Sequence, residues 1–182
     1  CCLSTGGCNV AMGQNAGRGY NSGSINISIG QNSGAQSGNS TGSGNISIGK
    51  VGQCISSGSA NIAIGCGVNM STGNVTGDGN ISIGPYTGRR LTSGGYNTFL
   101  GSSAGRYTTS GGRNQFIGIS AGSQNQIGCE NTAIGCAAGS RATSGNHNTS
   151  IGRAAGFNNL TGHGNVAVGH SAGYGNKGSN NI

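Results

Sequence analysis

A short motif of alternating polar and apolar residues recurs along the whole chain. In each copy, an Asn is followed by two variable residues, an apolar residue and a Gly. In the copy at 61–65, Ile62 and Ile64 alternate with Ala63, as the residues of a short β-strand do. An eleventh copy starts at Asn181. The asparagines of the ten complete copies are Asn9, Asn26, Asn45, Asn61, Asn80, Asn97, Asn114, Asn131, Asn148 and Asn165.

The spacing of the motif identifies a repeat protein. Consecutive motif asparagines lie 16 to 19 residues apart, and a Gly stands three positions before each of them. A helical hairpin needs a period of about 33 residues or more, and each Gly inside a helix costs about 1 kcal/mol. We therefore predict an all-β fold over 1–182, a single parallel β-solenoid of about ten coils with two short strands each. At about 4.8 Å per coil, the rod is roughly 48 Å long.

Stacking of identical coils gives each column of residues a structural role. Asn above Asn predicts a ladder of side-chain amides, each donating to and accepting from its neighbours; the alternative is a set of solvated turn residues. The apolar residue three positions after each Asn is predicted to form an inner spine. This spine consists of Met12, Ile29, Ile48, Ile64, Ile83, Leu100, Ile117, Ile134, Ile151 and Val168.

The column two positions after each Asn is predicted to point to the opposite, outer side. It holds mostly Ala and Ser, which would let another chain approach closely. Phe99 and Phe116 depart from this pattern. Two interpretations remain open for them: a contact with another chain, or a local rotation of the strands that turns both rings into the core.

The amino-acid composition is interpreted differently once the repeat is known. The chain has 41 Gly among 182 residues and only 6% charged residues, and Leu, Ile, Val and Phe together number 29. Such a composition is typical of disordered chains. The repeat instead assigns much of the glycine to turns and the scarce apolar residues to regular columns. Each coil has a thin core, so we expect lateral association with further copies of the chain.

Two segments carry a resemblance to a known family. Residues 131–135, Asn-Thr-Ala-Ile-Gly, and 165–169, Asn-Val-Ala-Val-Gly, each precede Ala-Gly and look like the head repeats of trimeric autotransporter adhesins (YadA-like). Similar runs occur in phage and viral tail-fibre proteins. The resemblance covers 9–182 and implies a left-handed β-roll, a homotrimer and an adhesive or fibre-shaft role at a cell or virion surface.

The chemistry of the chain argues against an enzyme. Asp78 and Glu130 are the two carboxylates, and His147, His163 and His170 fall in variable or turn positions without an acidic neighbour in the sequence. Catalysis needs positioned acids, bases or nucleophiles. Calcium-binding β-rolls need an Asp in each repeat. We therefore predict no enzymatic activity, no cofactor and no metal site.

The net charge of +7 suggests one candidate binding surface. Arg89 and Arg106 share a column nine positions after the motif Asn, with Tyr107 beside them; Arg18 lies in the same column. A basic and aromatic stripe could bind a host-surface glycan or receptor; the alternative is that scattered arginines keep a neutral rod soluble. We expect no nucleic-acid partner and no membrane insertion in this segment.

The cysteines and the ends of the chain suggest assembly. Cys66 and Cys136 share a column but lie four coils apart, too far for a disulfide. We favour free or interchain thiols over intrachain bridges, with Cys1, Cys2 and Cys8 as candidates for pairing. The chain begins without Met and stops within the motif at Ile182. We interpret it as a section of a longer fibrous protein, or as a subunit that stacks end to end.

Three hypotheses about function follow. The first is an extracellular fibre protein, the shaft or head of a surface adhesin or a viral or phage tail fibre, that binds host receptors or spaces a binding tip. The second is a structural extracellular filament built by end-to-end stacking. The third, an ice-binding solenoid, calls for a Thr-x-Thr array, which the column predicted to face outward lacks.

Overall fold

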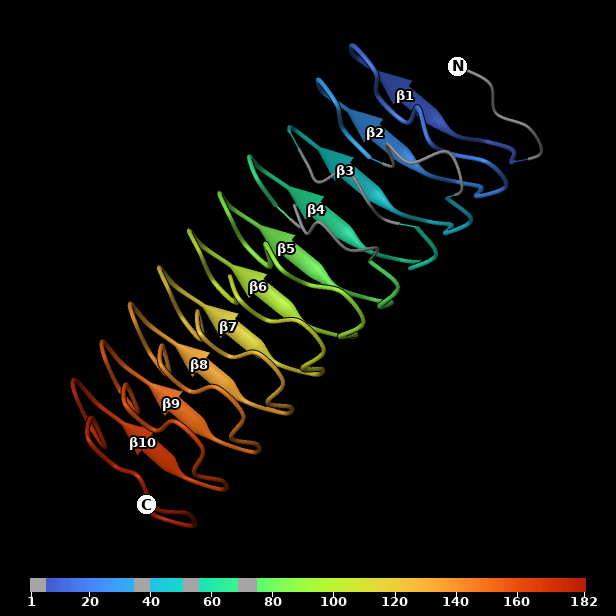
Figure 1. The fold of residues 1–182 in the computed structure, drawn as a ribbon. Coiled ribbons are helices and arrows are strands. Elements are labelled where there is room, and N and C mark those ends of the chain that lie inside the picture. The colour runs from blue at the N-terminus through green and yellow to red at the C-terminus, as the bar shows by residue number, and fades with distance from the viewer. Residues whose placement is uncertain (1–5, 35–39, 51–55, 69–74) are drawn as a thin grey trace.

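The chain folds into a stack of similar β-coils. The computed structural model describes residues 6–34, 40–50, 56–68 and 75–182. Figure 1 shows the strands lying side by side in one sheet, from the N-terminal end to the C-terminal end. Because each coil has nearly the same sequence, each strand meets an almost identical neighbour.

Ten strands of three residues form the sheet, in the chain order β1 to β10. Every neighbouring pair is parallel and in register, so that Ile62 pairs with Ile81 and Ile64 with Ile83. This confirms the predicted parallel β-solenoid of about ten coils. The strands are β1 (Val10–Met12), β2 (Ile27–Ile29), β3 (Ile46–Ile48), β4 (Ile62–Ile64), β5 (Ile81–Ile83), β6 (Thr98–Leu100), β7 (Gln115–Ile117), β8 (Thr132–Ile134), β9 (Thr149–Ile151) and β10 (Val166–Val168).

In the part of the chain that the structure describes, each coil contains one strand, not the two that the sequence predicted. The remaining described residues of each coil form turns, bends and irregular backbone, apart from the isolated bridge between Tyr20 and Ser40 and a bridge residue at Val75. These turns are still hydrogen-bonded from coil to coil; for example, the Gly105 N–H donates to the Ala121 carbonyl at 3.0 Å. Frequent positive-φ residues, such as Ser103 and Gly105, break the extended conformation while the stacking of coils remains regular.

The predicted inner spine lies on the outside of the coil. In each strand from β2 to β10, the middle residue is buried and the two flanking residues are partly or largely exposed. The outer face therefore carries Met12, Ile29, Ile48, Ile64, Ile83, Leu100, Ile117, Ile134, Ile151 and Val168. The Ala and Ser column, predicted to face outward, is the interior. Its side chains are small because the turn of the same coil crosses close behind the strand, where it places Ala104 and Ala121.

Phe99 and Phe116 occupy this interior without any rotation of their strands. The middle residues pair in unbroken register from Ser82 through Phe99 and Phe116 to Ala133. Both rings are buried, and they form a core cluster with Leu91 and the alanines of the adjoining turns. Neither ring is available for contact with another chain.

The motif asparagines form a continuous hydrogen-bonded ladder beside the strands. Asn97 is typical: its N–H and its Nδ2 both donate to Asn80 Oδ1 at 3.0 Å, and the same Nδ2 donates to the Gly111 carbonyl at 2.9 Å. The side chain of Asn97 is fully buried. Each amide thus satisfies polar groups of two neighbouring coils, and buried polar groups need such partners. A Cβ on Gly111 would overlap the Gly128 carbonyl oxygen, so this column accepts only Gly.

Candidate functional site

The outer face of the sheet is a regular, largely apolar surface of the described chain. Two columns project from it, one from the first and one from the third residue of each strand. In the third column, Leu100 is 42% exposed and Val168 is 64% exposed. A monomeric soluble protein rarely exposes a contiguous apolar patch of this kind. The face is therefore a candidate interface.

The two columns of this outer face differ in polarity along the rod. From β2 to β5, the first residue of each strand is Ile, as is the third. From β6 to β9, the first column changes to Thr98, Gln115, Thr132 and Thr149, and it returns to an apolar residue at Val166 in β10, while the third column stays apolar throughout. The outward pattern is Ile-x-Ile or Thr-x-Ile in most strands and nowhere Thr-x-Thr. An ice-binding face is expected to carry a Thr-x-Thr array. The face that points outward in the structure lacks this array, as does the face that was predicted to point outward.

The predicted basic and aromatic residues gather into one cluster. The guanidinium carbon of Arg106 lies 5.2 Å from the Tyr107 ring centroid and 5.9 Å from that of Tyr86. Arg89 lies 5.9 Å from the Tyr86 ring, and Arg90 lies 4.9 Å from the Tyr107 ring. The structure therefore brings Arg89, Arg106 and Tyr107 together and adds Tyr86 and Arg90. We call these five residues the Arg/Tyr cluster. Arg18 lies near the N-terminal end of the rod, in the coil of β1, several coils away.

No carboxylate neutralises this cluster within the described residues. The two acids of the chain are engaged elsewhere: Asp78 Oδ1 accepts from the Ser59 N–H at 2.7 Å, and Glu130 pairs with Arg113 at 3.1 Å. The Arg106 Nε atom is buried and has no hydrogen-bond partner. Three cations lie over two aromatic rings on a surface without a counter-charge. Such a surface can attract an anionic ligand.

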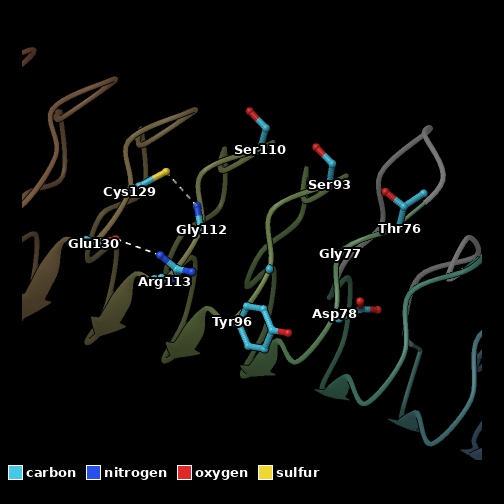
Figure 2. A pocket seen from close by; sticks show the side chains of 11 residues that line it. Thr76, Gly77, Asp78, Ser93, Tyr96, Ser110, Gly112, Arg113, Cys129 and Glu130 are labelled. Atoms are coloured by element: carbon cyan, nitrogen blue, oxygen red, sulfur yellow. Dashed lines mark hydrogen bonds and ion pairs between the residues drawn. The ribbon is translucent and has the colours of Figure 1, made fainter.

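A shallow groove lies on the edge of the rod, in the turns that precede β5 to β8 (Figure 2). Its volume is about 450 Å³. Figure 2 shows the Tyr96 ring and the Asp78 side chain on one side of it and the hydroxyls of Ser93 and Ser110 on the other. Arg113 and Glu130 form an ion pair at its far end.

This groove was not among the sites predicted from the sequence, although the sequence contains a signal for it. The position two residues before the motif Asn carries a side chain in nearly every coil. Consecutive coils have Gly at this position only at Gly95 and Gly112, and those two lie in the groove. Without a side chain there, the surface is hollowed between Asp78 and Cys129. Two consecutive Gly residues in this column are therefore the sequence signal of the groove.

One histidine has an acidic partner that the sequence did not indicate. His147 Nε2 lies 3.1 Å from Glu130 Oε2, because the two residues stack in the same column of consecutive coils. Both side chains are exposed, by 66% and 43%. His163 Nδ1 instead accepts a hydrogen bond from the Asn146 N–H at 3.0 Å. Within the described ranges, no group of three or more His, Cys, Asp or Glu residues is placed to hold a metal ion.

The described cysteines have free thiols. Cys8, Cys66 and Cys136 are exposed and Cys129 is half-buried. Cys1 and Cys2, which the sequence analysis proposed for pairing between chains, lie outside the described residues, as does Cys54. The described thiols therefore leave the prediction of free or interchain cysteines open.

Comparison with known proteins gave no relative of this chain: no family model, no curated protein and no solved structure matches it. The part of the chain that the structure describes contains no helix with the length and apolar character needed to span a membrane. Proposals about function therefore depend on the geometry of the rod and its surfaces.

Proposed function

We propose that this chain is the shaft or head section of an extracellular fibre, part of a surface adhesin or of a viral or phage tail fibre. The observation that carries the proposal is the third column of the outer face of the sheet, which is apolar in all ten strands. A rod with one apolar face is suited to lateral assembly with copies of itself. Its role is mechanical and adhesive, without catalysis and without a cofactor.

The proposed assembly is a homotrimer in which three outer faces meet around a common axis. Burying an Ile, Leu or Val side chain completely contributes about 1.5–3 kcal/mol, and Ile64, Leu100, Ile134 and Ile151 are each only partly buried in one chain. A single coil has little core of its own, because its interior holds mostly Ala and Ser. Shared burial would supply the stability that the isolated coil lacks.

The Arg/Tyr cluster is the proposed receptor-facing surface of this fibre. It lies in the turns that follow β5 and β6, away from the outer face of the sheet, and assembly through that face would leave it accessible. Three arginines without a counter-charge favour an anionic partner such as an acidic glycan of the host surface. The tyrosine rings add flat surfaces for contact with sugar rings.

The oligomeric state tests the proposal directly. Light scattering coupled to size-exclusion chromatography should give a mass three times the 17.6 kDa of one chain. The double variant Ile64→Lys/Ile134→Lys should be monomeric with an unchanged circular dichroism spectrum, because both side chains already face outward. Ile127→Lys is the matched control: Ile127 is 55% exposed but lies in a turn outside the sheet face, and its variant should remain trimeric.

Two results would overturn this assembly. A wild-type chain that stays monomeric at high concentration contradicts lateral association. Long unbranched filaments that persist in the Ile64→Lys/Ile134→Lys variant would favour the alternative, a structural extracellular filament built by end-to-end stacking.

A further inference from the structure

The edge groove contains a break in a second hydrogen-bonded ladder. We call this the upstream ladder; it is formed by the side chains two positions before each motif Asn. Each side chain accepts a hydrogen bond from the backbone N–H at the same position of the preceding coil. The Ser24 N–H donates to Ser43 Oγ at 3.0 Å, and the Ser43 N–H donates to Ser59 Oγ at 3.2 Å. The acceptor type varies widely, since Asp78, Cys129, Asn146 and His163 also serve.

Two consecutive steps of the upstream ladder lack their acceptor. The Asp78 N–H should donate to the side chain at position 95, and the Gly95 N–H to the side chain at position 112, but both positions are Gly. A Cβ built on Gly95 would lie 3.5 Å from the Asp78 nitrogen, and one built on Gly112 would lie 3.7 Å from the Gly95 nitrogen. Neither N–H group makes a hydrogen bond to any described residue. The floor of the groove therefore presents two free donors in adjacent coils.

We propose that this groove binds a neutral saccharide. The two N–H groups are one coil apart, about 4.8 Å along the rod. This separation is comparable to that between equatorial hydroxyl oxygens on alternate carbons of a pyranose ring. Two such oxygens would accept from the Asp78 and Gly95 N–H groups and so take the place of the missing side chains. No other pair of described coils offers this arrangement in the upstream ladder.

The walls of the groove match the same ligand class. The Tyr96 ring packs over Gly79, which has no side chain. Because Tyr96 is 68% exposed, the rest of its ring surface is accessible to a sugar ring. Hydroxyls of Ser93 and Ser110, which make no hydrogen bond to described residues, line the opposite rim and can donate to or accept from sugar hydroxyls. Aromatic surface combined with a few placed polar groups is typical of small-molecule sites.

The charges of the groove favour a neutral ligand over an anion. The Arg113 guanidinium, the only cation lining the groove in the described chain, is already paired with Glu130 at 3.1 Å. Asp78 contributes a further negative charge, and its Oδ1 is held towards Ser59 in the preceding coil. An anionic sugar would therefore meet a net repulsive field here, unlike at the Arg/Tyr cluster.

The inference is independent of fibre assembly, because every group involved belongs to one chain. The test is a titration of ¹⁵N-labelled protein with glucose, galactose, mannose and N-acetylglucosamine, followed by NMR. At least one sugar should shift the amide resonances of Asp78 and Gly95 in a saturable way. Glucuronate should bind more weakly than glucose. These shifts are measured whether or not the chain is trimeric.

Variants separate specific binding from other causes. Gly95→Ser places a hydroxyl over the Asp78 N–H, as the other serines of the upstream ladder do, and should weaken binding by at least about fivefold without lowering the melting temperature. Tyr96→Ala should weaken binding while leaving both N–H groups free. Ser43→Gly, which opens the same ladder far from Tyr96, is the control and should bind like the wild type.

Three results would overturn the proposal. One is the absence of saturable shifts at Asp78 and Gly95 with all four neutral sugars. Another is a Gly95→Ser variant that binds sugar as tightly as the wild type. The third is tighter binding of glucuronate than of glucose, which would contradict the assignment of a neutral ligand.

Discussion

Phe99 and Phe116 stack inside adjacent coils, with ring centroids 5.4 Å apart and planes inclined by 11°. Both rings are buried, and they occupy a column that is otherwise Ala or Ser. Two large rings fit because Gly105 and Gly122 pass directly beside them; a Cβ on either glycine would lie within about 2.7 Å of a ring carbon. The centre of the rod thus contains the larger of the two clusters of buried apolar residues in the described chain.

Removal of one ring should destabilise the centre of the rod. We expect Phe116→Ala to lower the free energy of unfolding by about 3–5 kcal/mol, because the rigid coil cannot collapse around the cavity. Chemical denaturation followed by circular dichroism measures the change. Gln115→Ala, at the exposed neighbouring position, should have an effect within about 0.5 kcal/mol. A loss below about 1 kcal/mol for Phe116→Ala would contradict the packing described.

The Gly–Phe contact predicts a coupled pair. Gly122→Ala should destabilise the chain, since its Cβ would overlap the Phe116 ring and its φ is +55°. The double variant Gly122→Ala/Phe116→Ala should lose less stability than the sum of the two single variants, because the overlap disappears with the ring. The coupling measured in a double-mutant cycle should be about 1 kcal/mol or more. Strict additivity would show that only the backbone conformation of Gly122 matters.

The sequence predicted the architecture but inverted the faces of the strand. The period of 16 to 19 residues determines a stack of parallel coils, and the strictly repeated Asn locates the amide ladder. The alternation of Ile62, Ala63 and Ile64 shows that the two faces of the strand differ, but it does not show which of them points into the coil. Larger apolar side chains normally point inward, yet in this rod the interior column holds Ala or Ser in every coil except those of Phe99 and Phe116, because the turn of each coil crosses directly behind the strand. The geometry of the turn decides which face of the strand points into the coil, and the sequence predicted a second strand in the place of that turn.

The Asn ladder predicts a large effect from a small chemical change. Asn97→Asp replaces the Nδ2 donor with an oxygen that would face Asn80 Oδ1 and the Gly111 carbonyl. A buried carboxylate beside two acceptors is strongly unfavourable, so we expect a loss of at least about 3 kcal/mol in unfolding free energy. Asn158→Asp is the matched control, because Asn158 is partly exposed and its Oδ1 already accepts from Arg141. Equal effects of the two substitutions would argue against a buried ladder.

The candidate binding surfaces were predictable to different degrees. The column containing Arg89 and Arg106 placed the two arginines in adjacent coils, so the sequence indicated the Arg/Tyr cluster. It did not show that Tyr86 joins the cluster or that both carboxylates lie elsewhere, since these facts depend on how the turns fold. The groove was not predicted because it arises from two absent side chains. Gly95 and Gly112 are distinctive only within their column, since the chain contains 41 Gly residues.

The Arg/Tyr cluster should govern binding to polyanions. We expect Arg89→Gln and Arg106→Gln each to weaken binding to heparin at low salt by roughly two- to fivefold, with the difference vanishing as salt screens the charges. Arg153→Gln removes the same charge at an exposed site beside His170 and should change binding less. Salt-gradient elution from a heparin column measures all three variants. An equal effect of Arg153→Gln would mean that net charge alone controls binding.

The upstream ladder predicts that two similar substitutions have opposite effects on stability. Gly112→Ser should raise the free energy of unfolding by about 1 kcal/mol, because its hydroxyl would accept from the free Gly95 N–H and the unfolded chain would lose glycine freedom. Ser43→Gly should lower it by a similar amount, since it frees the Ser24 N–H that now donates to Ser43 Oγ. Thermal denaturation of the two variants measures both changes. If Gly112→Ser destabilised the rod, the close approach of the new Cβ to the Gly95 carbonyl oxygen, 3.1 Å, would outweigh the added hydrogen bond, and the prediction of a stabilising serine would be wrong.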